Sequence, residues 1–526
     1  MHKILVTDPL NDHGIRELME ASDVEVVKKT GLTESQLIEE IPNYHALLVR
    51  SQTQVNARVL SAAKNLKVIG RAGVGVDNID VPAATERGII VLNAPDGNTI
   101  STSEHTFAML MALARNIPQA YRSIVSGEWN RKAFVGVELR DKTLGIIGMG
   151  RIGTEVAKRA KVFGMHVLGY DPFLTKERAK RLGVDKVEFP KLIAESDFIT
   201  VHTPLIKETH HLISTEAFAH MKDGVRILNC ARGGIIDEEA LMKALNSGKV
   251  AGAALDVFEE EPPTDHPLLK HPRVVATPHL GASTVEAQEN VALDVSEEVL
   301  HVLRGQTFKN AVNLPSIPEE LQERIRPYQT LAEKLGHFVV QTTKGAVEKM
   351  TVSYAGALNE FDTSPLTRMI LKGVLSHFVT DVNYVNVMAL AKERGLEVKE
   401  ERSSAIRAFT NLITVHIQTA DEERSVSGTL VNGFGARIVK IDTYSIDLQP
   451  EDHLLYIEHQ DRPGAIGRVG TILGDHEVNI ATMQVGRRDV GGRAIMVLSV
   501  DKPVSTDIIK ALNELEEIHS VTEIDL

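Results

Sequence analysis

Three side chains, Arg232, Glu261 and His279, lie in short motifs whose residue types suit acid–base chemistry on a molecule that carries a carboxylate. Arg232 follows an apolar run and precedes two glycines, and its guanidinium fork matches a carboxylate and can polarise a neighbouring carbonyl. Glu261 closes an acidic run before two prolines, and His279 follows a Thr-Pro pair. Histidine exchanges protons near neutral pH, and a neighbouring carboxylate favours its charged form.

Taken singly, each of these motifs has a common structural explanation. An exposed arginine usually forms a surface ion pair, an acidic run is usually a solvated loop, and a lone histidine is usually structural. Taken together, they supply a carboxylate binder, a proton acceptor and an acid that orients the acceptor. Oxidation of a 2-hydroxy acid requires this set, because a hydride leaves C2 for a nicotinamide while the hydroxyl proton goes to a base.

A dinucleotide-binding unit is predicted between residues 143 and 171. An apolar run typical of a buried strand leads into Gly148, Gly150 and Gly153, which have the G-x-G-x-x-G spacing. The first glycine permits a tight turn, the second lets a pyrophosphate approach, and the third lets the next helix pack closely. That helix start presents free N–H groups to phosphates. Asp171 ends the following strand, where an acid binds the ribose hydroxyls and repels a 2′-phosphate, so NAD is predicted rather than NADP.

Strands and helices alternate along the first 310 residues, which predicts two Rossmann-like or flavodoxin-like α/β domains with parallel sheets. Ligands of such sheets bind at the carboxyl ends of the strands, where Thr203, Arg232, Asp256 and His279 fall. A glycine-rich turn at 70–80 also follows a strand, and we interpret it as a backbone cradle for a carboxylate rather than a simple tight connection. Strands are expected at 3–7, 46–50, 68–71, 89–92, 197–202, 226–230, 251–256 and 274–277.

Two long helical stretches, residues 98–113 and 283–303, are expected to cross between these domains, which makes the first one discontinuous. A proline-bearing linker is expected at 314–320. The last segment follows the order β-α-β-β-α-β, a ferredoxin-like arrangement. The predicted domains are residues 1–97 with 284–310 for substrate binding, 98–283 for NAD binding, 318–450 as an intervening α+β domain without a catalytic motif, and 453–526 as the ferredoxin-like domain.

The composition, with 43% hydrophobic and 25% charged residues, is that of an ordinary globular protein. The formal charge of −13 gives no general attraction to nucleic acid or to an anionic membrane, so neither is predicted as a partner. Cys230 is the only cysteine, which rules out an intramolecular disulfide and suits a reducing compartment. Without a signal-peptide pattern or a membrane-spanning run, we expect a cytoplasmic protein, and no metal site is predicted.

Four motifs, in this order, resemble consecutive signatures of the D-isomer-specific 2-hydroxyacid dehydrogenases: GIIGMGRIG, NCARGGIIDEEAL, ALDVFEEEPP and TPHLGAST. The resemblance covers residues 1–310 and implies an NAD-dependent oxidoreductase. It implies that Arg232 binds the substrate carboxylate, that His279 is the general acid/base, and that Glu261 pairs with its imidazole. The cofactor site implied by the glycine motif and the resemblance comprises Gly148, Gly150, Arg151, Ile152, Gly153, Asp171, Thr203, Cys230 and, at the nicotinamide carboxamide, Asp256.

The rest of the chain resembles two additional domains that some members of this family carry. Residues 318–450 resemble an intervening "allosteric substrate-binding" domain, and residues 453–526 resemble an ACT domain, a regulatory module that binds amino acids between paired copies. These domains imply NAD-dependent oxidation of 3-phospho-D-glycerate to 3-phosphooxypyruvate, the first step of L-serine biosynthesis, by a homotetramer that L-serine inhibits. The implied serine site comprises His459, Asp461 and Asn479, and Asp461 stands where some relatives carry asparagine.

A phosphorylated substrate requires local cations in a chain of this net charge. Arg50 and Arg71 end two consecutive strands of the first domain and are expected to face the cleft. Arg131 resembles a basic residue that relatives supply from a neighbouring subunit. The resemblance also implies that the backbone of Val74 and Gly75 helps to hold the substrate carboxylate.

Two other functions stay open at this point. The chain could act on a different 2-hydroxy acid, such as 2-hydroxyglutarate, or it could be a non-catalytic NAD-sensing regulator with the same fold. The intact Arg232, Glu261 and His279 favour turnover, and the acidic chain with its ACT-like tail disfavours a co-repressor. Phosphoglycerate is preferred mainly because of the tail, which is an argument from analogy.

Overall fold

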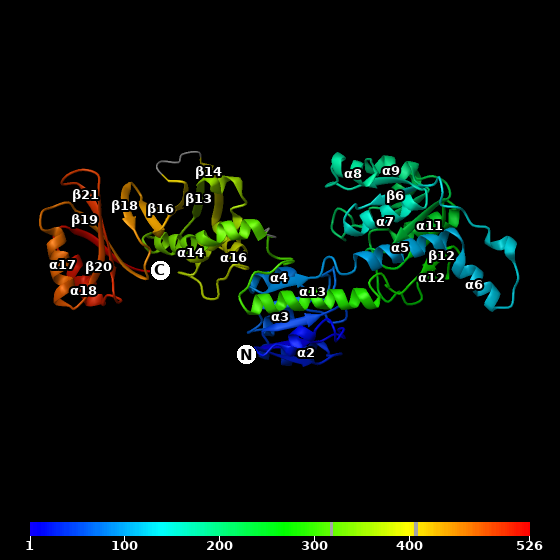
Figure 1. The fold of residues 1–526 in the computed structure, drawn as a ribbon, viewed down its shortest axis with the longest axis horizontal. Helices are drawn as coiled ribbons and strands as arrows, with labels where there is room; N and C mark the ends of the chain where they lie inside the picture. The colour runs from blue at the N-terminus through cyan, green and yellow to red at the C-terminus, as the bar shows by residue number, and fades with distance from the viewer. Residues whose placement is uncertain (316–318, 404–408) are drawn as a thin grey trace.

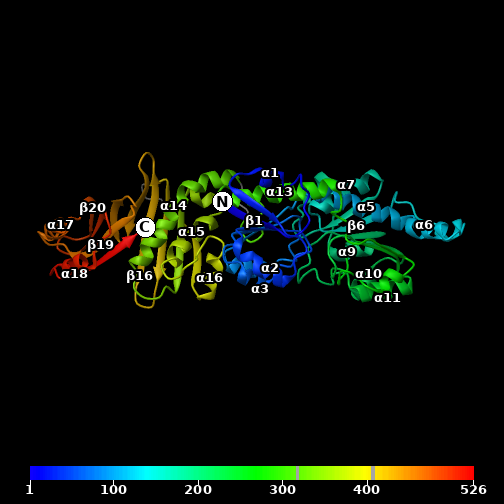
Figure 2. The ribbon, with the colours of Figure 1, turned by 90° about the horizontal axis from the view of Figure 1, so that it is seen from below.

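In the computed structural model, the chain forms four folded units in an elongated molecule (Figure 1). The nucleotide-binding sheet lies at one end and the ferredoxin-like unit at the other, and a view at right angles agrees (Figure 2). The structure describes residues 1–315, 319–403 and 409–526. The predicted linker at 314–320 and the predicted domain start at 318 therefore fall partly outside the described residues. Within those ranges, no helix has the length and apolar character needed to cross a membrane.

The first unit is a five-stranded parallel sheet in the order β2-β1-β3-β4-β5, which is the flavodoxin-like order. One face packs on α2 (Glu34–Glu40), α3 (Ala57–Ala62) and α4 (Val81–Glu86). The other packs on α1 (Arg16–Glu20) and on α13 (Val285–Leu303), which returns from far along the chain. The strands are β1 (His2–Val6), β2 (Val24–Lys28), β3 (Ala46–Val49), β4 (Val68–Arg71) and β5 (Ile90–Asn93).

The second unit is a seven-stranded parallel sheet in the order β12-β11-β10-β9-β6-β7-β8. Helices α5 (Thr99–Ala114) and α7 (Arg151–Val162) cover one face, and α9 (Phe189–Glu195), α10 (Thr215–His220) and α11 (Glu238–Ser247) cover the other. The strand order reverses between β6 and β9, which creates the crevice where dinucleotides bind in such sheets. The strands are β6 (Thr143–Ile147), β7 (His166–Tyr170), β8 (Asp185–Lys186), β9 (Phe198–Val201), β10 (Val225–Asn229), β11 (Val250–Leu255) and β12 (Val274–Ala276).

The predicted fold class is confirmed, because both predicted parallel sheets are present and every strand predicted in the first 310 residues lies within one residue of an observed one. The short strands β2 and β8 were not predicted. The helix α13 packs so closely on the first sheet that a Cβ built on Gly70 would lie 2.8 Å from the Val295 side chain. The end of α13 is held by Arg304, which donates two 2.9 Å hydrogen bonds to Asp23.

The third unit is a six-stranded mixed sheet in the order β14-β13-β15-β16-β17-β18, in which β13 and β14 are parallel and the other pairs antiparallel. Helices α14 (Glu319–Gln341) and α15 (Ser364–Leu375) pack closely together, since a Cβ on Gly336 or Gly373 would meet backbone of the other helix within 2.4 Å. The remaining elements are α16 (Val387–Glu393), β13 (Lys349–Gly356), β14 (Glu397–Ser403), β15 (Asn411–Gln418), β16 (Glu423–Val431), β17 (Gly435–Ile441) and β18 (Tyr444–Leu448).

The last unit has the predicted β-α-β-β-α-β order, and its sheet order β20-β21-β19-β22 is ferredoxin-like. One face of this sheet is buried in the same hydrophobic core as the third unit, and the other packs on its own two helices. The two C-terminal units therefore share a core and are expected to move together. The elements are β19 (His453–Gln460), α17 (Ala465–Asp475), β20 (Ile480–Arg487), β21 (Arg493–Val500), α18 (Thr506–Asn513) and β22 (Ile518–Asp525).

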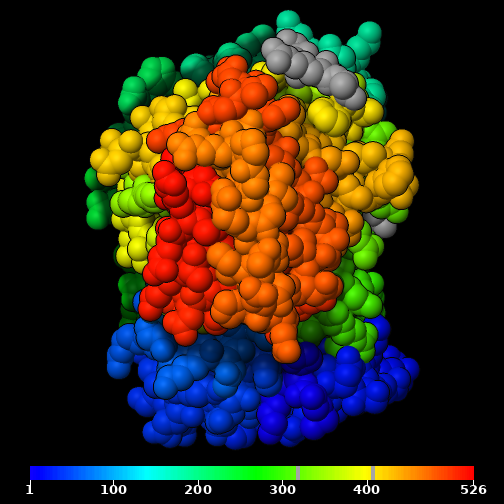
Figure 3. Space-filling model, turned by 90° about the vertical axis from the view of Figure 1, so that its left-hand side faces the viewer, coloured from blue at the N-terminus to red at the C-terminus, as the bar shows by residue number. Residues whose placement is uncertain are grey.

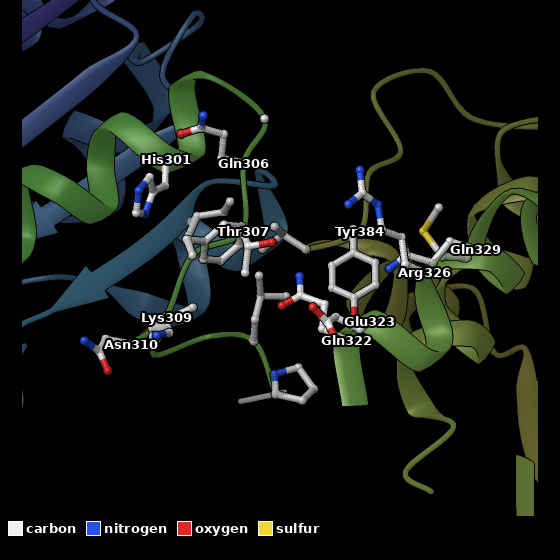
Figure 4. Close-up of a pocket in the computed structure, with 18 residues that line it drawn as sticks. His301, Gln306, Thr307, Lys309, Asn310, Gln322, Glu323, Arg326, Gln329 and Tyr384 are labelled. Atoms are coloured by element: carbon white, nitrogen blue, oxygen red, sulfur yellow. The ribbon is translucent and has the colours of Figure 1, made fainter. Parts of the chain in front are cut away.

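A cavity of about 850 Å³ separates the first unit from the third (Figure 4). His301, Thr307 and Lys309 line it from the side of α13, and Arg326 and Tyr384 line it from the opposite side. The N-terminal and C-terminal parts of the molecule are thus joined across a hollow junction lined by both polar and apolar residues, rather than through a continuous core.

Candidate active site

The carboxyl ends of β10, β11 and β12 bring together the motifs that contain Arg232, Asp256 and His279. These three strands are neighbours in one parallel sheet, so their ends meet at the same edge. Arg232 follows β10, Asp256 follows β11, and His279 follows β12. The arrangement lies at the edge where ligands bind in this class of sheet.

His279 and Glu261 form a hydrogen-bonded pair, with 2.8 Å between the imidazole Nδ1 and the carboxylate Oε2. Both side chains are partly exposed, so the imidazole is accessible from the cleft. Partial burial alone raises the pKa of Glu261, but its hydrogen bond to His279 and the backbone N–H of Phe258 lower that pKa below its usual value. A carboxylate that stays ionised next to an imidazole stabilises the charged imidazolium that proton uptake creates.

Asp256 is buried, and its carboxylate anchors the loop that carries His279. It accepts hydrogen bonds from the backbone N–H groups of Leu280 (2.7 Å) and Gly281 (2.9 Å) and from the Thr277 hydroxyl (2.6 Å). Its backbone oxygen accepts from the N–H of His279, whose φ of 55° is unusual for a non-glycine residue. Asp256 therefore holds the histidine in a specific backbone conformation.

His105 of helix α5 completes the contacts of this carboxylate and was not identified from the sequence. Its Nε2 lies 3.2 Å from the Asp256 carboxylate and 3.1 Å from the Thr277 hydroxyl. Burial alone raises the pKa of Asp256, but hydrogen bonds from His105, Thr277 and the Leu280 N–H lower it below its ordinary value. No local motif marks His105, because its partners lie far along the chain.

Arg232 is held at the cleft by both domains. Its Nη1 donates to the backbone oxygen of Ala231 (2.7 Å), and its backbone oxygen accepts from Asn229 Nδ2 (2.8 Å). Its Nε donates to Asp77 of the first domain at 2.9 Å. Gly75 lies so close that a Cβ built there would be 1.7 Å from Arg232 Nη2, so a larger residue at this position would have to displace the guanidinium.

Arg50 and Arg71 lie beside Arg232, and together they form a cluster of cations. Burial, with the charges of Arg232 and Arg50, lowers the pKa of Arg71 to about 10. The backbone N–H of Arg50 donates to the buried Asp8 at 2.6 Å, which fixes the loop that carries it. In the neighbouring turn, the Val74 backbone oxygen accepts from the Asn93 side chain at 2.6 Å.

The glycine loop has the geometry that a pyrophosphate requires. Gly148 has a φ of 94°, and a Cβ on Gly153 would lie 2.1 Å from the Gly148 oxygen, so close packing excludes larger residues. A Cβ on Gly150 would meet no atom within 4 Å, which leaves the space before helix α7 open to a phosphate. Asp171 accepts from the N–H groups of Met149 (2.8 Å) and Phe173 (2.7 Å) and so lies beside this loop.

The other cofactor candidates surround this loop. The Thr203 hydroxyl is buried without a partner among the described residues, and its methyl group would lie 2.9 Å from a Cβ on Gly148. Burial and the nearby Asp256 charge raise the pKa of the Cys230 thiol to about 12, so it is a wall of the site and not a nucleophile. Ile152 packs against the core, and Arg151 pairs with Asp96 across the cleft. The residues present fit a dinucleotide.

Four of the predicted binding residues lie away from this cleft. Arg131 lies in the exposed 3-10 helix η2 (Arg131–Phe134), beyond helix α6 (Ile117–Val125), which projects from the end of the molecule (Figure 1). In the last unit, His459 is buried, Asp461 accepts from Arg487 Nη1 at 3.1 Å, and Asn479 donates to Asp501 at 2.8 Å.

Comparisons with known proteins identify the family. Family models match residues 107–281 ("D-isomer specific 2-hydroxyacid dehydrogenase, NAD binding domain"), 324–442 ("D-3-phosphoglycerate dehydrogenase intervening domain") and 453–517 ("ACT domain"). The D-3-phosphoglycerate dehydrogenases of Bacillus subtilis and Archaeoglobus fulgidus are 50% and 48% identical to the chain, and each match covers 100% of both proteins. The chain belongs to the D-3-phosphoglycerate dehydrogenases, within the D-isomer-specific 2-hydroxyacid dehydrogenase family.

A solved relative supports the catalytic half in particular. The D-lactate dehydrogenase of Aquifex aeolicus, crystallised with NAD and lactic acid, matches with 31% identity and a TM-score of 0.54, over 60% of this chain and 100% of that one. This family member, like its relatives, is an NAD-dependent oxidoreductase, and NAD is its cofactor. The resemblance stated from the sequence motifs is thereby confirmed.

Loss of the His279 imidazole is expected to lower kcat about 10²- to 10⁴-fold, the range typical of a lost general base. Glu261→Gln is expected to lower kcat less, because the carboxylate that stabilises the imidazolium is gone while the imidazole remains. Steady-state rates of NADH formation between pH 6 and 10 measure both effects. Near wild-type turnover in His279→Ala would mean that another group takes the proton.

His105→Leu removes a donor to the buried Asp256 carboxylate and is expected to cost about 1–3 kcal/mol of unfolding free energy and about tenfold in kcat. His105→Gln, which keeps a donor of similar reach, is expected to restore most of both. Met111→Leu on the same helix conserves volume and serves as the control. Thermal unfolding and turnover numbers of the three variants test this expectation. If His105→Leu and Met111→Leu lose equally little stability and activity, His105 does not support the Asp256 carboxylate.

Proposed function

We propose that this enzyme oxidises 3-phospho-D-glycerate to 3-phosphooxypyruvate with NAD, the first step of L-serine biosynthesis. The observation that carries the proposal is the cluster of Arg50, Arg71 and Arg232 at the same cleft as the His279–Glu261 pair. A substrate with a carboxylate at one end and a phosphate at the other matches this distribution of cations. The full-length similarity to D-3-phosphoglycerate dehydrogenases supports the same substrate.

In the proposed reaction, Arg232 and the backbone N–H groups of Val74 and Gly75 hold the substrate carboxylate. His279 takes the hydroxyl proton, and Glu261 stabilises the imidazolium that results. Bound NAD supplies the acceptor for the hydride that leaves C2. The Asp256 anchor keeps His279 in place while its charge changes.

For the cofactor, we propose that the pyrophosphate lies over Gly148, Arg151 and Ile152 at the start of α7, with Asp171 on the adenosine ribose. The remaining members of the predicted set, which include Gly150, Gly153, Thr203, Cys230 and Asp256, would shape the pocket around it. The proposed domain boundaries are those predicted from the sequence, and a cytoplasmic location remains part of the proposal.

The proposed assembly is a homotetramer, in which Arg131 reaches the phosphate from a neighbouring subunit. Helix α6 (Ile117–Val125) and the residues that follow it support this role, because Ile117, Tyr121 and Trp129 are 53%, 67% and 80% exposed on a projecting arm. An arm of this composition is expected to be covered by a second copy.

We further propose that L-serine binds between two ACT domains. Within one chain, Asp461 and Asn479 lie at opposite ends of strand β20. Asp461 contacts Arg487, the last residue of this strand, and Asn479 directly precedes its first residue. An eight-residue strand spans roughly 25 Å, so the two side chains can share a ligand only if they come from different copies. The end of the molecule that carries α17 and α18 is open for such pairing (Figure 3). The buried His459 lies at the end of β19 beside Asp461.

Another 2-hydroxy acid, such as 2-hydroxyglutarate, is the alternative substrate. Arg50→Ala is expected to raise KM for 3-phospho-D-glycerate at least tenfold and KM for an unphosphorylated 2-hydroxy acid about twofold, because only the first carries the phosphate. Arg71→Lys tests the partly buried Arg71, because lysine keeps the positive charge but loses the guanidinium fork. The KM values are obtained from rates of NADH formation over a panel of 2-hydroxy acids. An equal rise in KM for phosphorylated and unphosphorylated substrates would contradict the phosphate-binding role.

L-Serine is expected to bind to the wild-type tetramer and to bind at least tenfold more weakly to Asn479→Ala, which loses one neutral or charge-assisted hydrogen bond. Calorimetry gives the affinity, and sedimentation shows whether the oligomer persists. If the intact wild-type oligomer binds no serine at millimolar concentration, the ACT domain has only an assembly role.

A further inference from the structure

The substrate-binding edge of Arg232 is already in contact with a carboxylate of the same chain. Its Nε donates to Asp77 Oδ2 at 2.9 Å, while its Nη1 is engaged with the backbone oxygen of Ala231. The pair crosses the cleft, because Asp77 belongs to the turn after β4 and Arg232 to the loop after β10. A guanidinium offers a carboxylate two parallel donors, and Asp77 uses the edge that a substrate would need.

From this geometry we infer that Asp77 is a positioning residue: a displaceable carboxylate that holds Arg232 in the substrate-free cleft and is exchanged for the carboxylate of the substrate. The inference rests on the proposed role of Arg232 as carboxylate binder. The affinity for substrate is then limited by competition between the substrate carboxylate and the Asp77 carboxylate for Arg232.

The surrounding turn supports an exchange. A Cβ built on Gly75 would lie 1.7 Å from Arg232 Nη2 and 2.7 Å from Asp77 Oδ2, so backbone, carboxylate and guanidinium meet at one point. This turn also contains the backbone N–H groups proposed to receive the substrate carboxylate. Two carboxylates at one such point repel each other, so the incoming one must displace the other.

Exposure distinguishes Asp77 from the other acid of this cluster. The Asp77 side chain is 66% exposed and that of Arg232 is 29% exposed, so the pair is open to an entering ligand. Asp8 is buried and accepts from the backbone N–H groups of Arg50, Gln52 and Thr53, so it is fixed in place. Asp77 can swing into solvent when Arg232 is taken by another anion.

The size of the effect follows from the strength of the pair. A partly exposed ion pair of this kind shifts an equilibrium about two- to fivefold. Because only the fraction of enzyme with a free Arg232 can accept substrate, the apparent dissociation constant is raised by the same factor.

Asp77→Asn is therefore expected to lower KM for 3-phospho-D-glycerate about two- to fivefold and to leave KM for NAD unchanged. The dissociation constant of oxalate for the NAD-bound enzyme, measured by calorimetry, is expected to fall by the same factor, since oxalate presents a carboxylate without a phosphate. Asp77→Glu keeps the charge and is expected to stay near the wild type in both measurements.

Asp96→Asn is the matched control, because Asp96 forms the other cross-cleft ion pair, with Arg151, and its loss changes the net charge equally. An unchanged or raised KM and oxalate dissociation constant in Asp77→Asn would overturn the inference. So would an equal decrease in Asp96→Asn, which would indicate a general effect of charge. If the wild type fails to oxidise 3-phospho-D-glycerate, the proposed substrate is wrong, but oxalate binding still tests the Asp77–Arg232 pair.

Discussion

The buried carboxylate of Asp256 is the interaction on which the geometry of the active site depends. An ionised carboxylate is costly to bury unless donors surround it. Here the donors are the His105 imidazole of α5, the Thr277 hydroxyl and two backbone N–H groups that directly follow His279. Because these donors come from different elements, the hydrogen bonds to Asp256 hold the loop that carries His279 against α5, the helix that joins the two N-terminal domains. The position of the proton acceptor is in this way tied to the packing between domains.

An acidic chain can bind a substrate with three negative charges only if positive charge is concentrated in the cleft. The formal charge of −13 repels anions at a distance, so attraction must be local. In the proposed site, Arg50, Arg71 and Arg232 would supply it, and the partial burial of Arg71 beside the other two cations makes the empty cluster unfavourable. The Asp77 carboxylate offsets part of that repulsion. If Asp77 is displaced as inferred, the site releases one anion when it binds another.

The four units fall into two parts with different coupling. The third and fourth units share one hydrophobic core, and Arg424, which pairs with Asp442 of its own unit, links the two through a hydrogen bond to Glu458 of β19. The first and third units enclose a cavity between them, and they also touch where Asn383 donates to the backbone oxygen of Gly88 at 3.2 Å. An effector bound at the C-terminal end can thus act on the catalytic half by favouring one arrangement of two bodies.

The sequence by itself determined the two parallel sheets and the glycine loop, and from it Asp171 and the set Arg232, Glu261 and His279 were proposed as site residues. These features are local: strand periodicity, glycines required for a tight turn, and motifs that each end a strand. The pairing of Asp77 with Arg232, and of His105 with Asp256, joins residues more than 100 positions apart, and no spacing rule predicts such contacts. Only the tertiary structure decided them, because they depend on how two domains and a crossing helix pack around the cleft.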